Sequence, residues 1–139
     1  MDRSLPRLSD HLNAPIDRIP FASLLGIELI MAADDRIEAK LAVRPEHCNP
    51  MGGLHGGATM SIADTLGAMG AFRNPPEGAN GTTTLGSKTN FLGPAKAGDT
   101  VIAVCTPIHR GRRTSVWQTQ ITTEAGRPVA LVTQTQMTL

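Results

Sequence analysis

The chain has 139 residues, a length that fits one domain with a hydrophobic core of its own. Its net charge of +1 offers no broad positive field for a nucleic acid. No apolar run is long enough to span a membrane and the first residues lead into no secretory segment, so we expect a cytoplasmic protein. Cys48 and Cys105 lack C-x-x-C spacing and are expected to be free thiols.

The first half of the chain predicts an arm, a short helix and a hairpin. Residues 1–20 are polar and dotted with prolines, and we expect an N-terminal arm before a single domain of residues 21–139. Residues 21–26 predict a brief helical turn that ends at a glycine. Two short runs flank Asp34-Asp35, and the second alternates apolar and polar residues, which predicts a hairpin with one solvated face.

The second half predicts one long helix followed by four strands. The helix covers about residues 56–72, which are apolar or small except for Asp64. After a loop rich in Pro and Gly come β-rich runs at about residues 82–92, 100–109, 114–124 and 128–138. A helix that is apolar on most of its faces must be covered nearly all round, so this order predicts an α+β domain with an antiparallel sheet wrapped around the helix.

Two of these β-rich runs, at residues 119–123 and 133–137, consist largely of Thr and Gln. Such residues are compatible with strands but supply little hydrophobic core. We therefore expect this part of the sheet to be covered by other subunits or by solvent.

Asp64 is the only charged residue of the predicted long helix. Its neighbours three and four residues away are Met60, Ser61, Gly67 and Ala68, so no cation of the helix can pair with it. Burial of an unpaired carboxylate is strongly unfavourable, which favours a position at a cleft.

The long helix is preceded by His55-Gly56-Gly57. The first backbone N–H groups of a helix are free and its dipole is positive there. Glycine lets a ligand approach the backbone closely, so this end can serve as an oxyanion or anion site. The same glycines also fit a simple tight turn into the helix. The carboxylate of Asp64 on the same helix favours a site.

Gly56 and Asp64 lie too far apart on one helix to act together easily. A separation of eight residues corresponds to a rise of about 12 Å. If both groups act on the same carbonyl, the Gly56 N–H and the Asp64 carboxylate come from different subunits. A monomer in solution would contradict this hypothesis.

The spacing of Asn49, His55-Gly56-Gly57 and Asp64 resembles that of the hotdog-fold acyl-CoA thioesterases of the phenylacetic-acid-degradation (PaaI-like) group. Segments 90–95, 98–99 and 111–113 are similar in order and spacing, so the resemblance covers nearly the whole chain. It implies a hotdog fold, hydrolysis of acyl-CoA, and a homodimer that pairs into a homotetramer, a dimer of dimers. No cofactor is implied, because coenzyme A is part of the substrate.

The resemblance also implies roles for individual residues. Gly56 would donate its N–H to the thioester oxygen, and Asp64 would act from the facing subunit as nucleophile or as general base on water. Asn49 matches the position that orients the water or the thioester; its local sequence favours a turn residue before Pro50, and the spacing to His55 supports the functional role. His55 matches a supporting histidine, and a capping or loop histidine fits as well.

A Ser or Thr near the start of the third strand lies beside the acid in this group. Thr82-Thr83-Thr84 occupies that region, and counting back from residues 91–94 favours Thr84. A slip of one residue would reverse its face, and threonines are also ordinary strand residues.

Arg110, Arg112 and Arg113 form the one dense cationic turn of the sequence, which suits the phosphates of coenzyme A. A charged hairpin turn that only maintains solubility is the competing interpretation. We expect one of these arginines, rather than all three, to bind the coenzyme A portion.

Other chemistries have less support. The G-x-S-x-G, H-E-x-x-H and G-x-x-x-x-G-K-[ST] patterns are absent, and the spacing of His47 and His55 does not suit a metal, so no metal site is expected. Two alternatives within the fold stay open: a non-catalytic hotdog protein that binds acyl-CoA or another apolar ligand, and a hydratase or dehydratase of 3-hydroxyacyl thioesters. Aryl and medium-chain acyl groups are both compatible with the composition.

Overall fold

The computed structural model describes Ile16 and residues 19–139. Most of the expected arm, residues 1–15 and 17–18, lies outside this described part. The elements follow the expected order, with one short 3-10 helix that the sequence did not predict. Their bounds are α2 Pro20–Leu25, β1 Glu28–Ala33, β2 Arg36–Ala42, η2 Pro45–His47, α3 Gly56–Arg73, β3 Thr82–Phe91, β4 Thr100–Arg110, β5 Thr114–Thr123 and β6 Pro128–Thr138.

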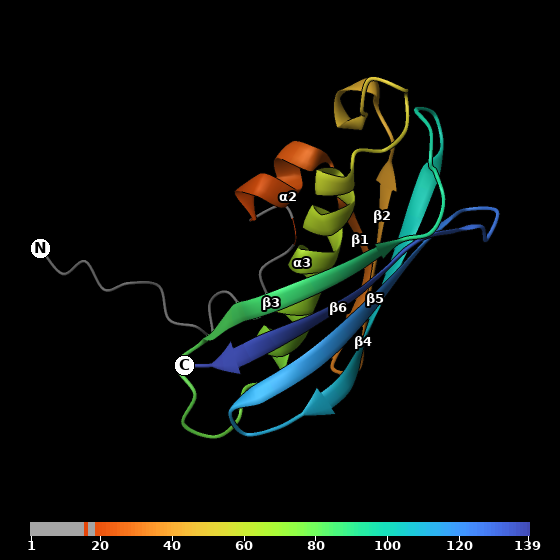
Figure 1. The fold of residues 1–139 in the computed structure, drawn as a ribbon. Helices are drawn as coiled ribbons and strands as arrows, with labels where there is room; N and C mark the ends of the chain where they lie inside the picture. Colours follow the sequence, from red (N-terminus) through yellow and green to blue (C-terminus); the bar gives the residue numbers. More distant parts are fainter. Residues whose placement is uncertain (1–15, 17–18) are drawn as a thin grey trace, which may run out of the picture.

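The six strands form one antiparallel sheet in the order β1-β2-β4-β5-β6-β3. The long helix α3 packs along one face of this sheet, and α2 lies beside α3 (Figure 1). A curved antiparallel sheet around one long helix is the hotdog fold, so the expected fold class is confirmed. Among the described residues, no helix is both long and apolar enough to cross a membrane.

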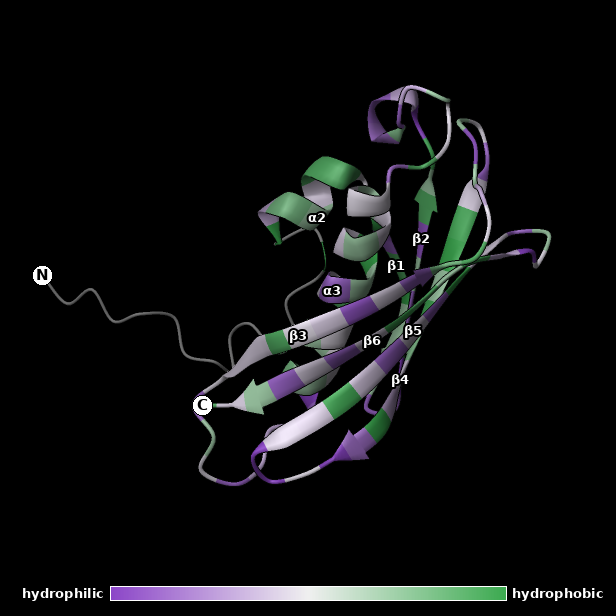
Figure 2. Cartoon of the chain, in the orientation of Figure 1, coloured by the Kyte–Doolittle hydropathy of each residue, from purple (hydrophilic) through white to green (hydrophobic). Residues whose placement is uncertain are grey.

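The predicted hairpin and short helix form for the expected reasons. In β2 the side chains of Ile37, Ala39 and Leu41 are buried while those of Arg36 and Lys40 are exposed, so one face of the hairpin is solvated. The short helix α2 ends at Gly26, whose φ of 79° is a left-handed conformation that glycine adopts without strain. In Figure 2 α2 is largely hydrophobic along its length.

The helix α3 approaches the sheet closely because it carries glycines on its inner face. At Gly67 a Cβ would overlap the side-chain amide of Gln134. At Gly70 a Cβ would lie 2.6 Å from Cζ3 of Trp117, which is fully buried. Small residues at these positions therefore set the distance between α3 and strands β5 and β6.

The expectation for the Thr- and Gln-rich runs was wrong for the face of the sheet that packs against the helix. Thr119, Gln134 and Gln136 are each only 1% exposed and lie on the sheet face that packs against the helix. Side chains alternate across a strand, so a run of polar residues can place every second one in the core. Their hydrogen-bonding groups then need partners inside the protein.

β3 is one of the two edge strands of the sheet, and β1 is the other. None of the ten residues of β3 is buried, and its large apolar side chains Leu85 and Phe91 are 57% and 58% exposed. The backbone of such an edge strand can pair with another chain. This edge borders the part of α3 that carries Asp64, which places the candidate acid beside a strand whose outer edge has no partner among the described residues.

Candidate active site

Asp64 lies near the middle of α3 with an exposed side chain. None of the ion pairs among the described residues includes it, in agreement with the isolation expected from the sequence. Its Oδ1 lies 3.4 Å from the hydroxyl of Thr84 on β3, a long hydrogen bond in which the hydroxyl donates. A carboxylate with one donor and no cation is available to a ligand that approaches from solvent.

Among the three candidate threonines of β3, Thr84 is the one that contacts Asp64. The hydroxyl of Thr82 instead lies 3.1 Å from the Met137 carbonyl and 3.1 Å from Gln136 Oε1. Directly after Thr84 the register between β3 and β6 shifts by one residue. Such a bulge changes the direction of the side chains beside it. The irregularity could not be read from the sequence, yet it lies next to the residue that meets the acid.

The second part of the candidate site is the N-terminus of α3. His55 is the N-cap, and its Nδ1 accepts a hydrogen bond of 2.8 Å from the N–H of Gly57. The structure thus gives His55 the capping position that the sequence left as one alternative. The N–H of Gly56 has no acceptor among the described residues, so it is available to a ligand.

A ring on the edge strand narrows the approach to this N–H. A Cβ built at Gly56 would lie 3.0 Å from Cζ of Phe91. Any larger residue at this position would press against the ring and fill the space beside the N–H. The absence of a side chain at Gly56 therefore keeps the first N–H of α3 accessible.

Asn49 sits in the loop that leads to α3. Its Oδ1 accepts hydrogen bonds from the N–H groups of Met51, at 3.0 Å, and Gly53, at 3.2 Å. The turn interpretation of Asn49 therefore holds. Its Nδ2 makes no hydrogen bond to the residues that the structure describes, so this donor is free to contact a substrate or a water.

The candidate residues form two groups within one chain. Asp64 and Thr84 meet beside the middle of α3, whereas Asn49, His55 and Gly56 belong to its N-terminal end and the preceding loop. The eight residues between Gly56 and Asp64 are helical, which gives the expected rise of about 12 Å. One chain alone therefore does not bring the free N–H and the carboxylate to one carbonyl group.

The three arginines of the cationic turn differ in their surroundings. The guanidinium of Arg110 donates a 2.6 Å hydrogen bond to the Asp34 carbonyl and lies 5.5 Å from the centre of the Trp117 ring. Arg112 and Arg113 have exposed side chains. Arg110 therefore ties the β1–β2 turn to β5, and the other two are the arginines free to meet a phosphate.

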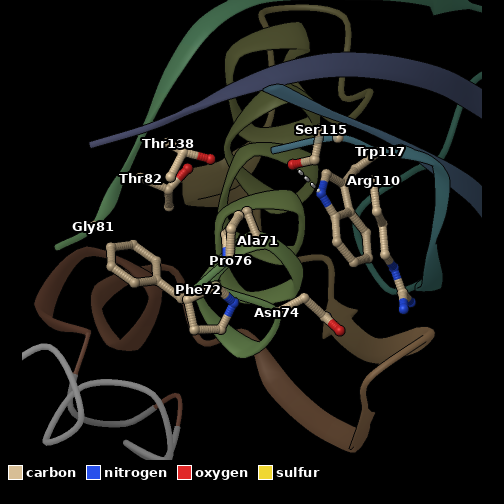
Figure 3. A pocket seen from close by; sticks show the side chains of 12 residues that line it. Ala71, Phe72, Asn74, Pro76, Gly81, Thr82, Arg110, Ser115, Trp117 and Thr138 are labelled. Atoms are coloured by element: carbon tan, nitrogen blue, oxygen red, sulfur yellow. Dashed lines mark hydrogen bonds between the residues drawn. The ribbon is translucent and has the colours of Figure 1, made fainter. Parts of the chain in front are cut away.

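The cationic turn lies at the end of α3 opposite Gly56. A small hollow joins this turn to the C-terminus of the helix, with Arg110 beside Trp117 on one side and Thr82 and Thr138 on the other (Figure 3). Its volume of about 20 Å³ has room for about one water molecule. The hollow cannot hold a nucleotide, so a phosphate would have to bind on the exposed surface of the turn.

Sequence reasoning did not identify Gln136 or Lys96. Gln136 Nε2 donates a 2.7 Å hydrogen bond to the hydroxyl of Thr84, the residue that contacts Asp64. Lys96 has an exposed side chain, and its backbone forms a bridge with Gly53 in the loop before α3. Only the register of β3 against β6 could have indicated Gln136, and only the bridge to Gly53 could have indicated Lys96.

The remaining nucleophiles and metal ligands form no competing site. Burial raises the pKa of the Cys105 thiol to about 11, although a hydrogen bond with Thr119 lowers it somewhat, so this thiol stays protonated at neutral pH. Cys48 is a free thiol whose Sγ donates to the Arg44 carbonyl. Within the described part of the chain, no three His, Cys, Asp or Glu side chains are grouped so that they could hold a metal.

Comparison with known proteins gives a consistent family. Residues 51–130, more than half of the chain, match the model of the thioesterase superfamily. A proofreading thioesterase, EntH of Cronobacter turicensis, is 36% identical over 103 residues, which cover 74% of this chain and 74% of that protein.

Solved structures agree with the sequence comparison. A thioesterase from Pseudomonas aeruginosa, solved as a mutant, matches with a TM-score of 0.83 and 30% identity. The match covers 99% of this chain and 96% of the Pseudomonas chain. A hypothetical thioesterase from Streptococcus pneumoniae, solved with coenzyme A, matches with a TM-score of 0.74 and 26% identity. The match covers 81% of this chain and 85% of the Streptococcus chain. The expectation of a thioester hydrolase is thus confirmed at the level of the family, and the chain belongs to the thioesterase superfamily.

Proposed function

We propose that this protein is an acyl-CoA thioesterase of the PaaI-like group, which hydrolyses an aryl or medium-chain acyl-CoA to the free acid and coenzyme A. The observation that carries the proposal is Asp64, an exposed carboxylate without a cationic partner among the described residues, beside the hydroxyl of Thr84. The superfamily membership supports thioester chemistry, and the relative from Streptococcus pneumoniae that was solved with coenzyme A supports an acyl-CoA.

In the proposed mechanism the N–H of Gly56 donates to the thioester oxygen. Negative charge grows on that oxygen as the tetrahedral species forms, so a donor there stabilises the transition state more than the substrate. Asp64 either attacks the carbonyl carbon or removes a proton from the water that attacks. In both routes the C–S bond breaks, the thiolate of coenzyme A takes up a proton and water supplies the new oxygen of the acid. No further cofactor is needed.

The loop before α3 would complete the site. Asn49 Nδ2, the free donor of its amide, would hold the water or the thioester while Oδ1 keeps the loop in place. His55 would act indirectly, because its ring caps the helix and thereby fixes the direction of the Gly56 N–H. An amide can orient a ligand without a change in its protonation state.

We propose that each site is shared by two subunits that pair along β3. Pairing of the two edge strands would cover Leu85 and Phe91, which are more than half exposed in one chain. It would also bring the exposed side of α3 in one subunit towards α3 of the other subunit. The Gly56 N–H of one subunit and the Asp64 carboxylate of the other would then reach the same thioester. Two such dimers would pair into the expected dimer of dimers.

The coenzyme A portion would bind through exposed cations. Arg112 and Arg113 are the arginines of the cationic turn whose side chains remain free, and Lys96 is a second candidate beside the loop that contains Asn49. Two variants can be compared, one in which Arg112 and Arg113 are both replaced by Ala and one with Lys96→Ala. The variant that has lost a contact with a phosphate of coenzyme A should show a higher KM for the acyl-CoA. The increase should become smaller at high salt, because screening already weakens the contact in the wild type.

The proposed function is tested by release of free thiol from a panel of aryl and aliphatic acyl-CoAs. Asp64→Asn should lower kcat by about a hundredfold or more, as expected for loss of a general base or nucleophile. The matched control is Asp35→Asn, which neutralises an exposed carboxylate in the β1–β2 turn and should leave kcat unchanged. No thiol release from a folded protein that binds acyl-CoA would overturn the proposal in favour of non-catalytic binding.

A further inference from the structure

Two glutamines of β6 are buried under α3 and differ in their hydrogen bonds. Gln134 and Gln136 are each 1% exposed and lie on the same face of the strand. Gln134 Nε2 has only a 3.5 Å contact with the Asp64 carbonyl, and its Oε1 has no partner among the described residues. Gln136 is bonded at both ends of its amide. The amide of Gln136 is therefore held at both ends, whereas that of Gln134 is not.

The contacts of Gln136 determine where the hydroxyl proton of Thr84 points. Gln136 Nε2 donates to Thr84 Oγ1 at 2.7 Å, and Thr84 Oγ1 lies 3.4 Å from Asp64 Oδ1. A hydroxyl has one proton, so a threonine oxygen that accepts from the amide has its proton left for the carboxylate.

A reversed amide would have the opposite effect. Its oxygen would face Thr84 and accept the hydroxyl proton, which would leave lone pairs directed at Asp64. In the structure the amide oxygen of Gln136 faces Thr82, whose hydroxyl lies 3.1 Å from this oxygen and 3.1 Å from the Met137 carbonyl. In this orientation Gln136 donates to Thr84, and Thr84 donates to the carboxylate of Asp64.

We propose that Gln136 is a positioning residue for the reaction proposed above, acting through Thr84 on Asp64. Asp64 is exposed and forms no ion pair within the described part of the chain, so the Thr84 hydroxyl is the donor that holds its Oδ1. With Oδ1 held, Oδ2 faces the substrate or the water in one orientation. This inference rests on the proposed function, but it concerns a contact that exists without substrate.

The kinetic test is a double-mutant cycle between Gln136→Met and Thr84→Val. Methionine keeps the length of the side chain and removes its hydrogen bonds. Gln136→Met should lower kcat by about tenfold with KM unchanged. This is the size expected for loss of one hydrogen bond, here the bond to Thr84, which in turn contacts the carboxylate. In a Thr84→Val background the same change should have almost no further effect, because the residue through which Gln136 acts is gone. If the two substitutions lower kcat independently, so that the loss in the double variant is the product of the two single losses, the inference is wrong.

The matched control is Gln134→Met, which makes the same substitution at an equally buried neighbour that does not contact Thr84. It should lower thermal stability less than Gln136→Met, because Gln134 has fewer hydrogen bonds to lose, and it should leave kcat nearly unchanged. Equal losses of kcat in both variants would show a general packing effect and would contradict the positioning role.

A second readout does not require turnover. In protein with ¹³C-labelled aspartate, the side-chain carboxyl signal of Asp64 is assigned by its loss in Asp64→Asn. This signal should shift in Gln136→Met and in Thr84→Val, and it should stay in place in Gln134→Met. An unchanged signal in Gln136→Met would overturn the inference even if the protein hydrolyses acyl-CoA, whereas a shift without any thiol release would contradict only the proposed function.

Discussion

The packed side of α3 and the exposed border of that side show how one helix can combine a core with a reactive surface. The side that packs on the sheet carries Gly67 and Gly70, and neither position has space for a Cβ. Asp64, three residues before Gly67, lies at the border of this packed side, where it is exposed beside the edge strand β3. Gly56 at the end of the helix differs from the inner glycines, because its missing side chain leaves space for a ligand. Glycines on one helix thus have two separate purposes, close packing and access.

The largest effect is expected at the end of α3. Gly56 is the first residue of the helix, where proline is well tolerated, and His55 before it has φ −63° and ψ 138°, which suit a following proline. Gly56→Pro removes the N–H proposed to bind the oxyanion and should lower kcat by about a hundred- to a thousandfold. Thiol release measures kcat, and circular dichroism checks that the helix is intact.

Gly56→Ala is the control, because it keeps the N–H and adds only a methyl group against the exposed Phe91 ring. It should reduce kcat less than Gly56→Pro. Equal losses in the two variants would show that the space at Gly56 matters and that its N–H does not.

Disruption of the β3 edge should have the next largest effect. Leu85→Asp places a charge on a side chain that is 57% exposed in one chain and would be covered by a partner. The subunit should stay folded, while light scattering should show a monomer whose kcat/KM is lower by about tenfold or more, because half of each site is missing. Ile108→Asp, at 58% exposure on the internal strand β4, should leave the dimer and its activity intact.

A change on the packed side should act on stability and spare the chemistry. Gly67→Ala forces a methyl group into the Gln134 amide and should destabilise the fold by about 1–3 kcal/mol, even though alanine is the better helix former. Urea denaturation measures the loss, and kcat of the folded fraction should stay near the wild-type value. The double variant with Gln134→Ala should be more stable than the sum of the single changes predicts, because the overlap is removed.

The smallest effect concerns Cys105, which is buried in the core on β4. Its pKa of about 11 in the native state exceeds the ordinary value of 9.0, so the native protein keeps the proton to higher pH than the unfolded chain. The neutral thiol therefore contributes its full stability below about pH 9, and this contribution is lost as pH rises through about 11.

The unfolding free energy of the wild type minus that of Cys105→Ala should be constant below about pH 9 and should fall between about pH 9 and pH 11. If this difference in unfolding free energy does not vary with pH, the raised pKa of the Cys105 thiol in the native state is contradicted. Alkylation of native protein at pH 8 should accordingly modify Cys48 before Cys105.

Much of the fold was predictable because its signals are local. Alternation in β2, the glycine after α2 and the apolar run of α3 each determine an element without reference to distant residues. The burial of Gln134 and Gln136 was not predictable, because polar residues in a strand do not reveal which face they occupy or what lies opposite. Their partners on α3 and β3 come from other parts of the sequence.

The candidate site divides in the same way. The spacing from Asn49 to Asp64 was readable, and the contact between Thr84 and Asp64 agrees with the choice among three threonines. The position of Arg110 over Trp117 was not readable, because it depends on the β1–β2 turn that reaches the end of α3. The roles of these residues in catalysis stay predictions.

The central claim, a site built from the end of one α3 and the middle of another, is tested most directly by subunit complementation. Gly56→Pro and Asp64→Asn subunits with different tags are expressed together, and the mixed dimer is purified by both tags. A shared site predicts one fully wild-type site and one doubly altered site in each mixed dimer, and hence about half of the wild-type activity from two inactive parents. A mixed dimer as inactive as both parents would contradict the claim, because each site would then lie within a single subunit.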